Sequence, residues 1–146
     1  MAEGLLIAVG SDHAGLNLKR AVVKALGERG HEVLDLGTDS AESVDYPDFA
    51  HAVAAKVVSG DAPLGVLICG SGIGMSLSAN RHAGVRAVVC SDTFSARMAR
   101  MHNDANVLCM GERVVGEGLA LDILDAFLGA SFEGGRHARR VGKIEL

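Results

Sequence analysis

The feature that most constrains the fold is an alternation of short apolar runs with helical patterns along the whole chain. The apolar runs predict five strands, at residues 5–9, 31–36, 64–69, 85–90 and 107–110. Helical spacing predicts helices at residues 17–28, 46–58, 93–102 and 119–128, and a further helix that ends near residue 80. Strands that are apolar throughout are typical of a parallel sheet covered by helices on both faces. We therefore expect a single three-layer α/β/α domain over residues 1–146, Rossmann-like, with five parallel strands and a basic C-terminal tail at 131–146.

Composition and charge narrow the class of protein. The net charge is −4 and the aromatic residues are one Tyr and four Phe, which argues against a nucleic-acid partner. The apolar runs are much shorter than the roughly 20 residues of a membrane span, and residues 1–4 lack the basic start of a signal peptide. Three cysteines without C-x-x-C spacing argue against a disulfide framework or a structural zinc site. We expect a compact cytoplasmic enzyme or binding domain without a membrane partner.

Two unusual loops indicate where a ligand binds. Residues 11–15 (Ser-Asp-His-Ala-Gly) follow the first predicted strand, and residues 69–74 (Cys-Gly-Ser-Gly-Ile-Gly) follow the third. In open parallel sheets, ligands bind beyond the carboxyl ends of the strands, where the winding direction reverses. The first and third strands commonly flank that crevice, so we expect both loops to line one site.

The glycine loop suits an anion, but its pattern is not specific. Glycines allow backbone N–H groups to converge on a ligand at a helix N-terminus, where the helix dipole favours negative charge. A dinucleotide fingerprint would require a third glycine where Met75 stands, and no G-K-[ST] follows to make a P-loop. Anion binding and a tight structural turn therefore both remain open for this loop.

Several side chains near these loops could do chemistry, and each also has a simpler explanation. Cys69 is either a small buried side chain or a base, because a helix N-terminus favours a thiolate. His102 could transfer protons, and His13 beside Asp12 could form a polar clamp. We assign Cys90 and Cys109 to packing. The remaining histidines have no evident partner and are expected to be surface or capping residues: His31, His51, His82 and His137. No H-x-x-x-H spacing supports a metal site.

Arginines are the candidates for holding an anionic substrate. Arg136, Arg139 and Arg140 lie close together in the tail, where they form either a solvated face or a phosphate grip. Arg113 follows the fifth predicted strand and is therefore expected at the carboxyl edge of the sheet.

Taken together, these segments resemble the type B ribose-5-phosphate isomerases of the wider ribose/galactose phosphate isomerase family. The resemblance runs in order through nearly the whole chain. Its segments are residues 10–15, 45–48, 69–74, 79–80, 85–87, 102–104, 111–116 and 133–137.

The resemblance implies an aldose–ketose isomerase that interconverts ribose 5-phosphate and ribulose 5-phosphate through an enediolate, without a metal or organic cofactor. It implies that Cys69 moves a proton from C2 to C1 and that His102 assists ring opening, with Asp12 on the other side of the ring. Ser71 and the backbone amides of the loop from Gly70 through Gly72 to Gly74 would hold the enediolate oxygens. The implied phosphate ligands are His13, Arg113, Arg136 and Arg140, and the implied sugar contacts are Tyr46 and Asn103.

The resemblance also implies a homodimer or homotetramer with shared active sites, in which the equivalents of His102, Asn103 and Arg113 reach into the neighbouring site. One branch of the family uses a glutamate base where Met75 stands here, so Cys69 places this chain in the cysteine branch. Ser71 stands where many cysteine-branch relatives have threonine, which keeps the hydroxyl but leaves its rotamer less restricted.

Two other functions remain open from the sequence. The first is a related hexose-phosphate isomerase that acts on allose 6-phosphate or galactose 6-phosphate and differs in pocket length. The second is a phosphosugar- or nucleotide-binding module without catalysis. A pure binding module has no need of a thiol and a histidine in one crevice, which favours the enzyme.

Overall fold

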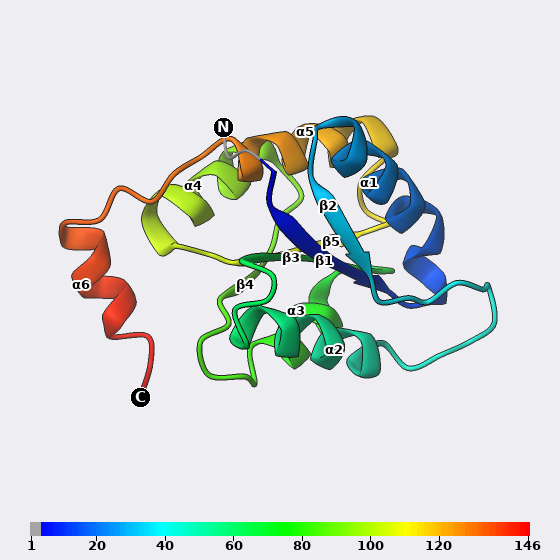
Figure 1. The fold of residues 1–146 in the computed structure, drawn as a ribbon, viewed down its shortest axis with the longest axis horizontal. Coiled ribbons are helices and arrows are strands. Elements are labelled where there is room, and N and C mark those ends of the chain that lie inside the picture. Colours follow the sequence, from blue (N-terminus) through cyan, green and yellow to red (C-terminus); the bar gives the residue numbers. More distant parts are fainter. Residues whose placement is uncertain (1–3) are drawn as a thin grey trace.

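The computed structural model describes residues 4–146, which form a five-stranded parallel sheet in the order β2-β1-β3-β5-β4 (Figure 1). The strands are β1 (Leu6–Ser11), β2 (Glu32–Asp35), β3 (Leu64–Cys69), β4 (Ala87–Val89) and β5 (Val107–Gly111). All four neighbouring pairs are parallel. This confirms the predicted fold class, and it makes β1 and β3, the two strands expected to flank the crevice, direct neighbours.

Helices cover both faces of the sheet. Helices α1 (Leu16–Glu28), α4 (Thr93–Asn103) and α5 (Glu117–Leu128) lie on one face, and α2 (Tyr46–Val58) and α3 (Ile73–Ala79) lie on the other (Figure 1). A short 3₁₀ turn, η1 (His13–Gly15), leads from β1 into α1. The last helix, α6 (Arg136–Gly142), packs beside α4 and away from the sheet. Within residues 4–146, no helix is long and apolar enough to cross a membrane.

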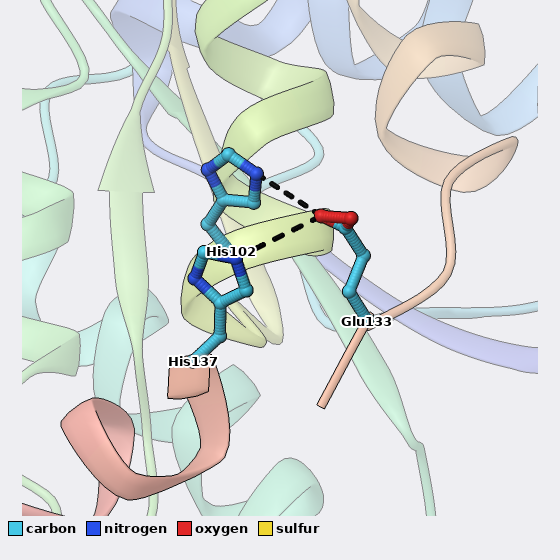
Figure 2. Close-up of side chains that lie close together, drawn as sticks. All are labelled: His102, Glu133 and His137. Atoms are coloured by element: carbon cyan, nitrogen blue, oxygen red, sulfur yellow. Dashed lines mark ion pairs between the residues drawn. The ribbon is translucent and has the colours of Figure 1, made fainter. Parts of the chain in front are cut away.

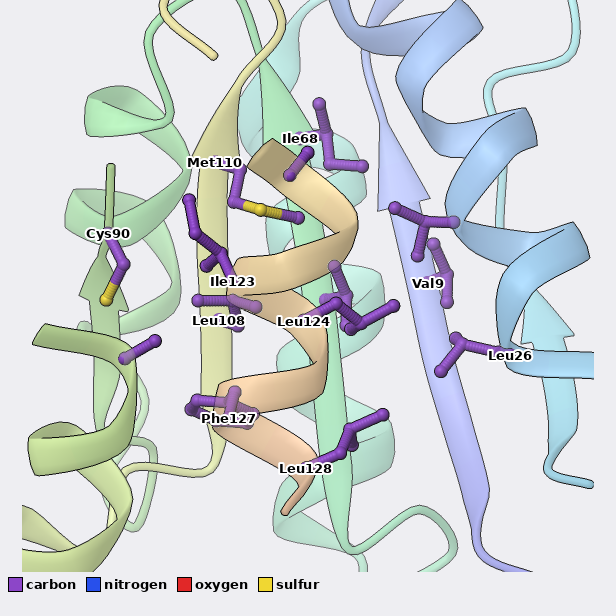
Figure 3. Close-up of a cluster of buried hydrophobic side chains, with 14 of the residues drawn as sticks. Val9, Leu26, Ile68, Cys90, Leu108, Met110, Ile123, Leu124, Phe127 and Leu128 are labelled. Atoms are coloured by element: carbon purple, nitrogen blue, oxygen red, sulfur yellow. The ribbon is translucent and has the colours of Figure 1, made fainter. Parts of the chain in front are cut away.

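The sheet separates two hydrophobic cores. In the larger core, Phe127 and Ile123 of α5 pack against Leu108 of β5 (Figure 3). In the smaller core, Val53 of α2 packs with Leu67 of β3. Successive residues of a strand point to opposite faces, so an uninterrupted apolar strand supplies both cores at once. All six residues of β3 are buried, which is the physical reason for its continuous apolar sequence.

The structure corrects the sequence analysis mainly at the edges of the sheet and in the tail. The two edge strands, β2 and β4, are two and three residues shorter than the predicted strands, because the parallel pairing covers only residues 32–35 and 87–89. Residues 136–142 form α6, which the sequence analysis described only as a basic tail. His137 is the one buried residue of α6, so its sequence carries no apolar stripe that would predict a helix.

A buried ion pair joins α1 to the end of β2. The side chain of Lys19 is only 1% exposed, and its ammonium group lies 2.7 Å from the carboxylate of Asp35, which is 37% exposed. Asp35 also accepts the backbone N–H of Gly37 at 3.0 Å. The neighbouring Asp39 lies 3.4 Å from the ammonium group and is exposed. The pair therefore fixes the start of the loop that leads to α2.

We expect the two partners of this pair to differ in their effect on stability. Asp35→Asn leaves a buried ammonium without its main partner and should lower the free energy of unfolding by about 3 kcal/mol. Lys19→Met should cost less, because Asp35 can still reach water, and the double variant should recover most of the loss of Asp35→Asn. Urea unfolding measures all three, with Asp39→Asn as an exposed control. Equal losses in the two single variants would contradict this account.

Candidate active site

A cavity of about 570 Å³ lies at the carboxyl ends of β1, β3 and β5. Its lining residues come from the two loops that the sequence analysis singled out, from the start of α2, from α3 and from the loop after β5. The lining residues are Asp12, Tyr46, Cys69, Gly70, Ser71, Ile73, Gly74, Leu77, Arg113 and Val114. The predicted position of the site is therefore where the structure places a cavity.

Backbone hydrogen bonds beyond the strand ends hold these loops together. The N–H of Asp12 donates to the carbonyl of Ile68 at 3.3 Å, which extends the pairing of β1 with β3. On the other side of β3, the N–H groups of Glu112 and Arg113 donate to the carbonyls of Cys69 and Gly70 at 2.9 and 3.1 Å. Sheet pairing thus places Arg113 beside Cys69 of its own chain, which corrects the expectation that Arg113 reaches into a neighbouring site.

Glycine is required where these loops touch. A Cβ atom at Gly15 would lie 2.5 Å from the carbonyl oxygen of Ile68, and one at Gly111 would lie 2.6 Å from the backbone of Ser71. Both distances are too short for any side chain, and the obstructing atoms belong to the backbone. These two glycines therefore allow the loops after β1, β3 and β5 to close around one cavity.

Cys69 is the buried end of β3 and points its sulfur toward the glycine loop. The N–H of Gly72, a residue in the left-handed conformation with φ 82°, donates to Sγ at 3.1 Å. Next to it, the hydroxyl of Ser71 accepts the N–H of Ile73 at 3.2 Å. A hydrogen bond from an N–H group is stronger to a thiolate than to a neutral thiol, so this contact suits a sulfur that acts as a base.

The other two cysteines are in a different electrostatic situation. Burial raises the pKa of the Cys90 thiol to about 11, and the nearby carboxylate of Asp92 adds to the effect. Burial also raises the pKa of the Cys109 thiol, which is completely buried in β5. Both groups therefore stay protonated at neutral pH and pack in the cores, as the sequence analysis expected.

Asp12 and Tyr46 also line the cavity. The carboxylate of Asp12 caps η1, because its Oδ1 accepts the N–H groups of Ala14 and Gly15 at 3.0 and 3.1 Å. The ring of Tyr46 lies directly against Gly74, where a larger residue would collide with it. His13 lies outside this lining, and its Nδ1 accepts the N–H of Val44 at 3.2 Å.

The structure places four other predicted site residues near the amino ends of the strands, opposite the cavity. His102 and Asn103 end α4, after which the chain enters β5 at its amino end. Cys69 lies at the far end of the adjacent strand, because Gly65 pairs with Val107 and Cys69 pairs with Gly111. Arg136 and Arg140 lie on α6, which packs beside α4. Within one chain, these four residues therefore do not join the cavity around Cys69.

A compact cluster surrounds His102 instead (Figure 2). Its Nε2 lies 3.1 Å from a carboxylate oxygen of Glu133, and its ring stacks on His137 with ring centres 4.2 Å apart. The sequence analysis missed Glu133 and gave His137 no partner. The available signal was the pair Gly134-Gly135, which forms a turn between Glu133 and His137 with φ values of 69° and 57°.

Comparison with known proteins identifies the family of the chain. The family model described as Ribose/Galactose Isomerase matches residues 7–144. The chain is 55% identical over 138 residues to ribose-5-phosphate isomerase B of Escherichia coli, covering 94% of this chain and 93% of that protein. It superimposes on a ribose-5-phosphate isomerase B of Clostridium thermocellum with a TM-score of 0.95 at 57% identity, covering 96% and 95% of the two chains.

A second solved structure, a ribose 5-phosphate isomerase of Thermotoga maritima, matches with a TM-score of 0.94 at 49% identity and covers 97% of both chains. These relatives are named as enzymes, which argues against the alternative of a binding module without catalysis. The chain therefore belongs to the ribose/galactose isomerase family and is an isomerase.

Proposed function

We propose that this isomerase interconverts ribose 5-phosphate and ribulose 5-phosphate through an enediolate, with no metal or organic cofactor. The observation that carries the proposal is the Cys69 thiol, placed under the Gly72 amide in a cavity that also holds Asp12 and Arg113. The relatives named as ribose-5-phosphate isomerases support the choice of substrate.

The chemistry follows from the order of groups around the cavity. Cys69 removes the proton from C2 of the open-chain aldose and returns it to C1, while the proton of the C2 hydroxyl moves to O1. Negative charge grows on these two oxygens in the transition state. The hydroxyl of Ser71 and the backbone amides of residues 70–74 are donors beside the thiol, and fixed donors of this kind stabilise such charge.

Ring opening must precede this step when the substrate is a furanose. The C1 hydroxyl loses its proton, the bond from C1 to the ring oxygen breaks, and the ring oxygen gains a proton. Asp12 at the cavity wall and His102 are the two groups that we assign to these transfers. Arg113 lies over Gly70 and binds the phosphate together with His13, Arg136 and Arg140, and Tyr46 and Asn103 contact the sugar.

A complete site therefore requires a second copy of the chain. Cys69 lies at the carboxyl ends of the strands and His102 lies near their amino ends, so a single chain cannot bring both to one substrate. The cavity is also bordered by the exposed apolar side chains of Ile73, Leu77 and Val114, which a partner would cover. We propose a homodimer, alone or within a homotetramer, in which each copy gives His102 and the α6 arginines to its neighbour.

We further propose that the enzyme acts in the cytoplasm. A catalytic thiol must stay reduced, and the reducing cytosol maintains thiols in that state.

Replacing the base should abolish turnover while leaving binding intact. We expect Cys69→Ala to lower kcat for ribose 5-phosphate about 1000-fold in the presence of a chelator, because a general base contributes roughly 10²–10⁴ in rate. Ligand affinity, measured by calorimetry, should change little. Cys90→Ala is the matched control, because Cys90 lies in the core outside the cavity, and it should keep its activity. Wild type that turns over only six-carbon sugar phosphates would overturn the substrate assignment.

Alkylation tests the same thiol without turnover. At neutral pH, iodoacetamide should label Cys69 before Cys90 and Cys109, because burial raises the pKa of the latter two thiols. Ribose 5-phosphate should protect Cys69 from the reagent. Peptide mass spectrometry after timed quenching gives the order of labelling. Faster labelling of Cys90, or no protection by substrate, would argue against Cys69 as the base.

Subunit mixing tests the shared site. Cys69→Ala and His102→Ala should each be nearly inactive alone, but a mixed dimer contains one site with both groups intact. Random exchange of subunits should therefore restore about a quarter of the wild-type activity. Each variant mixed with itself is the control. Mixed dimers that stay inactive, or an active monomer established by sedimentation, would refute the shared site.

A further inference from the structure

Glu133 lies against the histidine that we assign to ring opening. One of its carboxylate oxygens is 3.1 Å from His102 Nε2 and 3.8 Å from His137 Nε2 (Figure 2). The shorter distance is within the range of a hydrogen bond from a ring N–H, and the longer one is outside it. The carboxylate is thus directed mainly at His102.

The backbone fixes Glu133 in this place. The N–H of Glu133 donates to the carbonyl of Met101 at 3.0 Å, which attaches the C-terminal segment to the last turn of α4, next to His102. The chain then turns at Gly134 and Gly135, and the N–H of His137 donates to the carbonyl of Gly134 at 3.1 Å. Glu133 is therefore anchored by its backbone, independently of its side-chain contact.

His137 holds the other side of the ring. Its imidazole stacks on that of His102 with an angle of 5° between the planes. Burial lowers the pKa of His137, and the nearby His102 and Arg136 lower it further, although Glu133 acts in the opposite direction. A neutral His137 provides a flat stacking surface and does not compete for the negative charge of Glu133.

The same three side chains also have the composition of a metal site, because their ligand atoms all lie within 4.8 Å of one another. Their geometry does not suit one ion. An imidazole binds a metal ion in the plane of its ring, and the planes of these two stacked rings are nearly parallel, so one ion cannot lie in both. We therefore attribute the cluster to interactions among the three side chains and not to a metal ion.

We propose that Glu133 is a positioning residue for His102, which it holds by Nε2 so that Nδ1 is the ring nitrogen that exchanges a proton with the sugar. The proposal rests on the proposed function, because it gives His102 its role in ring opening. A carboxylate beside Nε2 favours the tautomer with the proton on that nitrogen, and the stack on His137 fixes the plane of the ring.

The reverse substrate separates ring opening from the isomerisation itself. Ribulose 5-phosphate has its 5-hydroxyl blocked by the phosphate and therefore stays open-chain. Exchange of its C1 hydrogen with deuterium from the solvent requires the Cys69 base but no ring opening. NMR in D₂O follows this exchange, and a coupled assay follows turnover of ribose 5-phosphate in the forward direction.

The test compares Glu133→Ala, Glu133→Gln and the exposed carboxylate control Glu28→Gln. We expect Glu133→Ala to lower the forward kcat about 10- to 100-fold with little change in KM, as is typical when a supporting partner of a functional histidine is lost. Deuterium exchange at C1 should stay near the wild-type rate. Glu133→Gln keeps an oxygen acceptor and should retain most of the forward activity, and Glu28→Gln should behave as wild type. The ¹⁵N NMR signals of His102 should show the Nε2–H tautomer in wild type and a mixture of tautomers in Glu133→Ala.

Different failures have different meanings. Unchanged forward turnover in Glu133→Ala would overturn the positioning role, and so would an equal loss of turnover and exchange, which indicates a merely structural effect. If His102→Ala itself keeps full forward turnover, the role of His102 in the proposed function is wrong. If Cys69→Ala keeps exchange at C1, the assigned base is wrong. Glu133→Gln has nearly the same shape as the wild-type residue, so a folding defect in Glu133→Ala still leaves a folded variant for the spectroscopic test.

Discussion

Parallel pairing of β3 between β1 and β5 is the interaction on which the rest of the site depends. Because the three strands run in one direction, their carboxyl ends meet at the same edge, and the loops that follow them begin within hydrogen-bonding distance. The pairing continues beyond the strands through Asp12, Glu112 and Arg113. An acid, a thiol and a guanidinium group that are far apart in the sequence therefore share one cavity without any dedicated contact between their side chains.

This arrangement requires the backbones of the loops after β1, β3 and β5 to pack closely against one another. Gly15 and Gly111 stand where a neighbouring loop leaves no room for a Cβ atom, and Gly72 takes a left-handed conformation that directs its N–H at the sulfur of Cys69. The abundance of glycine after the strands thus has a geometric cause. The same loop geometry that makes the cavity also supplies the amide donors that we assign to the enediolate.

The functional groups are divided between the two ends of the strands, and this division connects catalysis to assembly. The carboxyl end, with Cys69, has a cavity, a thiol and an apolar border, and the amino end, with His102, has two stacked imidazoles, a carboxylate and the arginines of α6. Neither set of groups is a complete site by itself. The two sets form one site if a second copy brings its amino end against the carboxyl end of the first, and in that case a loss of assembly is also a loss of activity.

The sequence by itself determined the sheet and one half of the candidate site. Apolar strands and their following loops are local patterns, so Cys69, Ser71 and Asp12 could be assigned to one crevice from their positions after the first and third strands. Only the tertiary structure decided that His102 lies near the amino ends of the strands, that residues 136–142 are helical, and that Glu133 and His137 contact the imidazole of His102. The physical reason for the missed helix is that α6 buries a single side chain, so its sequence has no helical periodicity of apolar residues. The cluster was missed because it joins segments that are 30 residues or more apart, which no local pattern predicts.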